Sequence, residues 1–222
     1  MDKVSVVVPA YNEEHYIGET LNTLKQCSWA EEIIVVNDGS RDRTGEIADV
    51  HSDKSVHLER NYGKSYAIKQ GWKRASGDII VCIDCDLGAS AAEAEKLIQP
   101  LLTYSFIDVV IGRLAEPKKR GFGLLKKRTQ RLVLKKTGCW LTAPLSGQRA
   151  FRRRWLPYIQ LDHATGFGVE VAMNIRLLQA GATVVEVDTD IKHRETGKDL
   201  KGFIHRGKQW LDIEKTIWSV SI

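Results

Sequence analysis

The feature that most constrains the fold is the alternation of short apolar runs with segments of helical periodicity in the first half of the chain. The first run, residues 4–8, is almost entirely valine, which is typical of a strand buried on both faces of a parallel sheet. Similar runs lie at residues 33–36, 56–58 and 79–83, and helical patterns fill the intervals. This order predicts an α/β fold with a doubly wound, mostly parallel sheet.

The second half of the chain has a less regular pattern. Residues 109–111 and 184–187 predict two further strands, and the spacing of Val171, Ile175 and Leu178 predicts a helix that ends at Gly181. We see no internal repeat and no low-complexity linker between the halves. The sequence therefore predicts one domain in which residues 1–112 and residues 113–222 are two halves.

Composition and charge narrow the class of protein only modestly. The chain of 222 residues has a formal charge of +5 and a pI of about 9.0, which favours anionic partners without selecting one. A strand-like segment follows directly after Met1, so we expect no signal peptide, and no apolar run has the length that a bilayer requires. These features predict a cytoplasmic protein whose membrane contact, if it has any, is peripheral.

The four cysteines include one C-x-x-C pattern, formed by Cys82 and Cys85. This pattern suggests thiol redox chemistry or half of a metal site. We reject both interpretations, because residues three apart on a strand point to opposite faces and no second cysteine pair completes a zinc site. Reduced and mostly buried cysteines are the better interpretation.

Polar residues follow three predicted strands at their carboxyl ends, where a doubly wound sheet binds its ligands. These are residues 9–14 after the first strand, residues 37–40 after the second, and Asp84-Cys85-Asp86 after the fourth. Two carboxylates at a strand end suit a hard cation such as Mg²⁺ or Mn²⁺. Taken alone, the two aspartates are equally typical of turns and helix caps.

Two further candidates lie on this edge. Asp38, in Asp38-Gly39-Ser40, is typical of a turn and N-cap, and its carboxylate also suits hydrogen bonds from a base or ribose. Lys64 opens a helix after Gly63, where backbone N–H groups and an ammonium can meet a phosphate. The first glycine of a P-loop is replaced by Leu58, so we exclude a P-loop NTPase.

The second half offers three more titratable candidates. His193 follows the last predicted strand and is either a third metal ligand or an ordinary surface histidine. Glu170 begins a helix, where an acid interacts favourably with the helix dipole in any case. Glu170 and Asp162 are the two candidate catalytic bases.

Together these motifs resemble the family 2 glycosyltransferases, which have the GT-A fold of nucleotide-diphospho-sugar transferases. The resemblance covers roughly the first 110 residues, through residues 4–14, Asn37-Asp38-Gly39-Ser40, Gly63-Lys64 and Asp84-Cys85-Asp86-Leu87, in the expected order. It implies a Mg²⁺ or Mn²⁺ cofactor on Asp86 and His193, and Glu170 and Asp84 as the catalytic residues, with Glu170 on the hydroxyls of the transferred sugar. The residues that it implies for the nucleotide-sugar are Pro9, Ala10, Tyr11, Glu13, Asp38, Lys64, Asp84 and Cys85.

The second half resembles two groups within this family. Residues 144–147, 166–170 and 186–188, followed by His193-Arg194, are similar to glucosyl-3-phosphoglycerate synthases, and polyprenyl-phosphate glycosyltransferases are similar as well. The resemblance makes residues 1–112 the nucleotide-sugar half and residues 113–222 the acceptor half. It implies transfer of a hexose from a UDP-glucose or GDP-mannose type donor to a phosphate-containing acceptor such as 3-phosphoglycerate. A lipid-phosphate acceptor at the membrane and a catalytically silent nucleotide-binding protein are the alternatives.

Positive charge is concentrated in residues 117–136, which contain nine Lys or Arg and no acidic residue. Arg128, Arg131 and Lys135 share one helical face, which suits an anionic bilayer, an acidic acceptor or plain solvent. No RNA or DNA motif accompanies this stretch, so we expect no nucleic-acid partner. We expect residues 118–136 on the acceptor side of the site, and the sequence leaves open whether the chain forms a homodimer.

Overall fold

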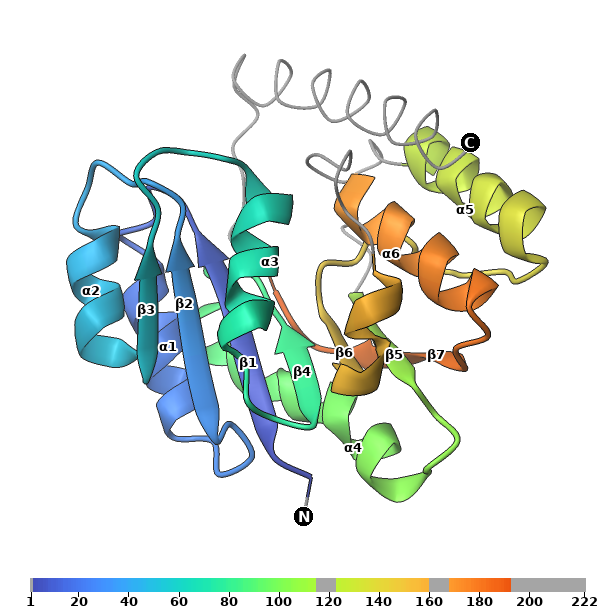
Figure 1. The fold of residues 1–222 in the computed structure, drawn as a ribbon, viewed down its shortest axis with the longest axis horizontal. Helices are drawn as coiled ribbons and strands as arrows, with labels where there is room; N and C mark the ends of the chain where they lie inside the picture. The colour runs from blue at the N-terminus through green and yellow to red at the C-terminus, as the bar shows by residue number, and fades with distance from the viewer. Residues whose placement is uncertain (1, 115–122, 160–167, 193–222) are drawn as a thin grey trace.

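The computed structural model of this chain describes residues 2–114, 123–159 and 168–192. Within these residues seven strands form one sheet in the order β3-β2-β1-β4-β6-β5-β7 (Figure 1). The strands are β1 (Val4–Ala10), β2 (Glu32–Asn37), β3 (Lys54–His57), β4 (Ile79–Cys82), β5 (Val109–Leu114), β6 (Arg149–Arg152) and β7 (Val184–Thr189).

The predicted fold class is confirmed, with one addition. Strand pairs β1–β2, β1–β4, β2–β3 and β5–β7 are parallel, as the continuous apolar runs predicted. The addition is β6, which lies antiparallel between β4 and β5. Its sequence, Arg-Ala-Phe-Arg, is too short and too basic to stand out as a buried strand.

Helices cover both faces of the sheet (Figure 1). One face packs against α1 (Ile17–Lys25), α2 (Thr44–His51), η1 (Gly88–Ala94) and α4 (Glu95–Thr103). The other face packs against α3 (Lys64–Arg74) and α6 (Gly168–Gln179), with α5 (Gly123–Thr137) against α6 and η2 (Arg153–Tyr158) nearby. Helix α3 approaches the sheet closely because Gly71 has no side chain: a Cβ there would lie 2.3 Å from Cγ1 of Val7.

The two halves expected from the sequence share this sheet. Residue 112 lies inside β5, and β6 from the second half separates β5 from β4 of the first. The functional division at residue 112 stays a prediction, because the sheet itself has no boundary there.

The C-x-x-C cysteines are buried in different parts of the core. Cys82 lies in the core on the α3 side of the sheet, where Trp72 Nε1 donates to its sulfur at 3.3 Å, and Cys85 lies in the core on the α1 side. Burial raises the pKa of the Cys82 thiol to about 11, and burial together with nearby carboxylates raises the pKa of Cys85 well above its ordinary value. Neither sulfur is suited to thiolate chemistry.

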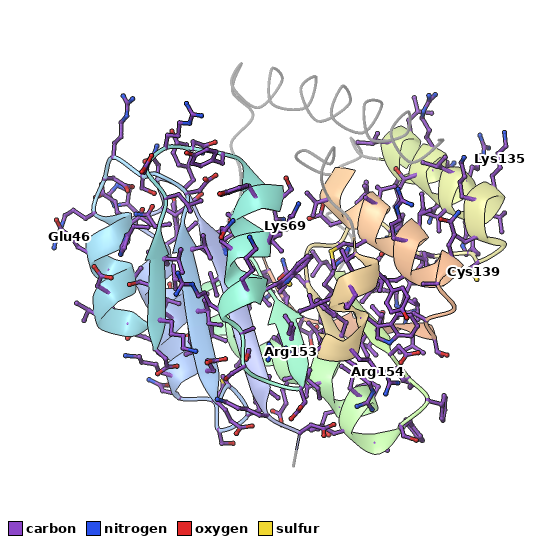
Figure 2. All side chains as sticks on the ribbon, in the orientation of Figure 1. Glu46, Lys69, Lys135, Cys139, Arg153 and Arg154 are labelled. Carbon is purple, nitrogen blue, oxygen red and sulfur yellow. The ribbon has the colours of Figure 1, made fainter. Side chains whose placement is uncertain are left out.

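This burial predicts selective thiol labelling. Native protein treated with iodoacetamide should be modified rapidly at Cys139, which is exposed beyond the outer end of α5 (Figure 2), and not at Cys82 or Cys85. Peptide mass spectrometry checks the sites, and Cys139→Ser should remove the rapid phase. Labelling of Cys82 at the rate of Cys139 would show that the buried pair is reactive after all.

Candidate active site

Three charged side chains from separate elements meet at the carboxyl edge of the sheet. Lys64 is the first residue of α3, Asp84 follows β4, and Glu170 lies in the first turn of α6. The Lys64 ammonium lies 3.0 Å from Oδ1 of Asp84 and 2.8 Å from Oε1 of Glu170. One cation thus bridges two carboxylates that are 86 positions apart in the sequence (170 − 84).

Glu170 is the most buried member of this cluster, with 2% of its surface exposed. Burial alone would lower the pKa of Lys64, but the two carboxylates outweigh it and raise that pKa, so the ammonium stays charged. Among the described residues, no group donates a hydrogen bond to the second oxygen of Glu170, Oε2. A buried carboxylate oxygen without a donor costs free energy, so this atom is suited to receive a ligand hydroxyl.

Asp84 is held from the side of β6 by a residue that the sequence interpretation missed. Gln148 is fully buried, and its Nε2 donates to Oδ2 of Asp84 at 2.7 Å while its Oε1 accepts from the Asp84 N–H at 3.2 Å. Beside it, a Cβ at Gly147 would lie 3.1 Å from both the Asp84 carboxylate and the Lys64 ammonium. The segment of residues 144–147 therefore ends directly against the charged cluster.

The Asp38 carboxylate is hydrogen-bonded to the backbone of the chain itself. Its two oxygens accept the N–H groups of Tyr62 and Gly63, both at 2.8 Å, and burial raises the pKa of its carboxyl against the effect of these bonds. Asp38 thereby fixes the loop that leads into Lys64. Gly39 has φ +69°, and a Cβ there would lie 2.4 Å from the carbonyl carbon of Arg60, so the same loop needs glycine at this position.

The segment that follows β1 is braced by the segment that follows β2. Asn12 lies in the left-handed region with φ 53°. Its side-chain oxygen accepts from the N–H of Arg41, and its own N–H donates to the hydroxyl oxygen of Ser40, both at 2.9 Å. The Glu13 N–H donates to Thr44 Oγ1 at 2.8 Å. Four of the residues predicted to bind the nucleotide-sugar lie at or beyond the end of β1. They are Pro9, Ala10, Tyr11, which is exposed, and Glu13. Cys85 offers only its backbone, because its side chain is buried.

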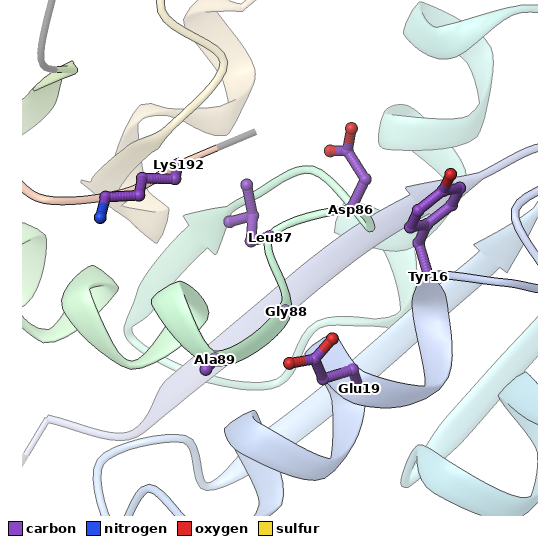
Figure 3. A pocket seen from close by; sticks show the side chains of 7 residues that line it. All are labelled: Tyr16, Glu19, Asp86, Leu87, Gly88, Ala89 and Lys192. Carbon is purple, nitrogen blue, oxygen red and sulfur yellow. The ribbon is translucent and has the colours of Figure 1, made fainter. Parts of the chain in front are cut away.

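Asp86 lines a hollow of about 250 Å³ on the α1 side of the strand ends (Figure 3). The other lining residues are Tyr16, Glu19, Leu87, Gly88, Ala89 and Lys192. Within residues 2–114, 123–159 and 168–192, no three metal-binding side chains form a cluster. The predicted ligand His193 and the candidate base Asp162 lie outside the described residues, so their roles stay predictions.

The bridge predicts a measurable coupling between Lys64 and Glu170. Lys64→Met should lower the free energy of unfolding by about 2 kcal/mol, because it leaves a buried carboxylate without its cation. Lys73→Met, on the exposed side of the same helix, is the matched control. Adding Glu170→Gln to Lys64→Met should recover part of the loss in urea unfolding; equal effects of Lys64→Met and Lys73→Met would contradict the bridge.

The sequence of this chain is similar to one protein family and to several known proteins. Residues 5–175 match the family described as Glycosyl transferase family 2. The undecaprenyl-phosphate 4-deoxy-4-formamido-L-arabinose transferase of Pectobacterium carotovorum subsp. carotovorum is 29% identical over 219 residues, with 90% of this chain and 63% of that protein covered. The Pseudomonas fluorescens protein of the same name is 31% identical over 166 residues, covering 68% of this chain and 47% of that one. The chain thus spans less than two thirds of these relatives.

The fold of this chain is similar to that of several solved structures. The glucosyl-3-phosphoglycerate synthase of Mycobacterium tuberculosis in complex with Mg²⁺ and UDP matches with a TM-score of 0.81 and 26% identity, covering 98% of this chain and 79% of that one. The complex of that synthase with Mn²⁺, UDP-glucose and phosphoglyceric acid matches with a TM-score of 0.78 and 27% identity, with 98% and 79% covered. The family match spans most of the chain, and the sheet is that of these structures. The chain therefore belongs to glycosyl transferase family 2 and has a GT-A-like fold.

Proposed function

We propose that this chain transfers a hexose from a nucleotide-diphosphate sugar, of the UDP-glucose or GDP-mannose type, to a phosphate-containing acceptor such as 3-phosphoglycerate. The observation that carries the proposal is the buried Glu170 oxygen with no donor among the described residues, set beside the Lys64–Asp84 ion pair. A sugar hydroxyl would satisfy that oxygen, and a diphosphate would take up the Lys64 ammonium. The structural neighbours named above, which bind UDP, UDP-glucose and phosphoglyceric acid, support the choice.

The residues present also fit a divalent cation. Mg²⁺ is usually held by one or two carboxylates together with substrate phosphates, and Asp86 and Asp84 supply two carboxylates within three residues at a strand end. Asp86 would be the main ligand, since both oxygens of Asp84 already face Lys64 and Gln148. We propose His193 as a further ligand. When bound, the cation would offset the charge of the leaving diphosphate.

The chain's own residues would divide the remaining work. Lys64 would hold the diphosphate at the start of α3, with the N–H groups of that first turn. Glu170 would accept a hydroxyl of the transferred sugar and fix its orientation, and Asp84 would hold the Lys64 ammonium in place. Pro9, Ala10, Tyr11, Glu13 and the loop fixed by Asp38 would surround the base and ribose.

The proposal predicts that donor binding depends on metal through Asp86. Asp86→Asn should lower the apparent Mn²⁺ affinity, measured as Mn²⁺-dependent UDP binding by calorimetry, by more than about 10-fold and abolish most turnover. Glu46→Gln, an exposed acid on α2 (Figure 2), is the control and should change neither.

Product NMR with UDP-glucose or GDP-mannose and 3-phosphoglycerate identifies the sugar, the acceptor and the anomeric configuration. Full turnover by Asp86→Asn would refute the metal assignment. UDP binding by the wild type without any turnover on these acceptors or on a polyprenyl phosphate would support the silent nucleotide-binding protein.

A second candidate acceptor is a lipid phosphate, favoured by the outer face of α5. This face presents exposed Arg128, Arg131 and Lys135 together with Leu124, which is 73% exposed, and Trp140, 53% exposed, follows the helix. Basic and apolar side chains on one face suit an anionic bilayer surface, where each Lys or Arg contributes about 1 kcal/mol. The described residues contain no helix that is long and apolar enough to cross a bilayer. The sequence relatives are named for an undecaprenyl-phosphate substrate.

The two acceptors predict different outcomes when Arg128, Arg131 and Lys135 are changed together to Gln. With a lipid acceptor, co-sedimentation with anionic liposomes should fall while donor hydrolysis is unchanged. With a soluble phosphorylated acceptor, its KM should rise, and wild-type co-sedimentation should be negligible. Changing Lys25, Lys73 and Arg74 to Gln alters the net charge equally on other surfaces and is the control. If neither liposome co-sedimentation nor the acceptor KM changes, the α5 face is only a solvent-exposed surface.

A further inference from the structure

We propose that Thr20, on α1, is a positioning residue that fixes the turn carrying Asp86 and thereby sets the affinity of the site for its divalent cation. The inference rests on the proposed function for its metal, but its geometry is a property of the chain alone. Thr20 belongs to none of the motifs that point to the active site. It lies on a helix whose other inward residues are the apolar Ile17, Leu21 and Leu24.

The hydroxyl of Thr20 is fully buried and makes three hydrogen bonds to a single turn. It donates to the carbonyl of Cys85 at 2.9 Å, and it accepts the N–H groups of Leu87 at 3.1 Å and Gly88 at 2.9 Å. The carbonyl of Tyr16, at 3.5 Å, is a much longer contact for the same hydrogen. One donor and two acceptor sites are all that a hydroxyl has, so the capacity of this group is used in full.

These three bonds bracket Asp86. They hold the backbone on its amino side at Cys85 and on its carboxyl side at Leu87 and Gly88, so the Cα of Asp86 has little freedom to move relative to α1. The turn is also pressed against the helix: Gly88 has φ +52°, and a Cβ there would lie 3.0 Å from the Glu19 carboxylate. Figure 3 shows the Asp86 side chain leaving this turn on the side away from Glu19.

The two aspartates of the site are therefore held by different elements. Gln148, just before β6, fixes Asp84 by its side chain and backbone, whereas Thr20 fixes the backbone around Asp86. A cation held by so few protein carboxylates depends strongly on where each oxygen lies. Loss of the Thr20 hydroxyl would let the Asp86 turn relax and would leave two N–H groups without their acceptor.

A purely structural role is the competing explanation, because removing a buried hydroxyl also lowers stability. Thr20→Val keeps the shape of the side chain and removes the hydroxyl, and Thr20→Ser keeps the hydroxyl. Thr129→Val on α5 is the matched control, because Thr129 is also fully buried. Among the described residues, its hydroxyl bonds only the carbonyl of Leu125 in its own helix, at 3.0 Å. Thr20→Ala provides the same comparison if Thr20→Val does not fold.

The test measures UDP binding by calorimetry at a series of Mn²⁺ concentrations. Thr20→Val should raise the Mn²⁺ concentration for half-maximal UDP binding by about 10-fold or more, while binding of UDP in EDTA is unchanged. Thr20→Ser should restore the wild-type value, and Thr129→Val should leave it unaltered even if its melting temperature falls. In metal-free protein, hydrogen exchange at the Leu87 and Gly88 amides should quicken in Thr20→Val only.

The outcomes separate this inference from the proposed function. A wild type whose UDP binding does not respond to Mn²⁺ would overturn the proposed function and the metal part of this inference with it. A wild type that responds, together with a Thr20→Val variant that responds at the same Mn²⁺ concentration, would overturn the inference alone. Unchanged exchange at Leu87 and Gly88 would show that the hydroxyl does not hold the turn.

Discussion

The contact on which the rest of the site depends is the Lys64 ammonium between Asp84 and Glu170. It joins the start of α3, the end of β4 and the start of α6, three elements that no local sequence pattern brings together. Burying Glu170 without this cation would be costly, because an uncompensated carboxylate in the interior loses its hydration. The position of α6 over the sheet and the charge of the active edge are therefore linked through one side chain.

The first half of the fold was readable from sequence because its strands lie deep in a parallel sheet, where nearly every residue must be apolar. The same rule explains why β6 was not predicted. Arg149 is 1% exposed although its guanidinium is charged, and it is accommodated because the carbonyl of Ser146 and the side chain of Asn174 accept from that guanidinium. A pattern of hydrophobicity cannot show a strand whose buried charge is satisfied by polar partners, one of them 25 positions away in sequence.

The residues of the candidate site also divide into those that could be predicted from the sequence and those that could not. Residues whose chemistry is visible at a strand end, such as Asp84, Asp86 and Lys64, were predictable from type and position. Gln148 and Thr20 were not, because each acts through bonds to a partner 64 or more positions away, and neither Gln nor Thr is distinctive in a sequence. Asp38 was singled out for its carboxylate, but the structure uses both its oxygens to hold the loop before Lys64. Type and spacing reveal groups that meet a ligand far better than groups that hold them.

The charges at the carboxyl edge of the sheet give a physical reason for the proposed donor to need a cation. Lys64 is one cation between two carboxylates, and Asp86 follows Asp84 by two positions, so the described strand ends hold three acids beside the Lys64 ammonium and the buried Arg149 guanidinium. A nucleotide diphosphate would add further negative charge at the same place. If Lys64 turned fully to the diphosphate, Asp84 and Glu170 would lose their contact with its ammonium, and one ammonium cannot balance the carboxylates and the diphosphate at once. In the proposed function Asp86 would hold a divalent cation whose charge offsets that of the diphosphate, so the Lys64 ammonium would meet the diphosphate without leaving Asp84 and Glu170.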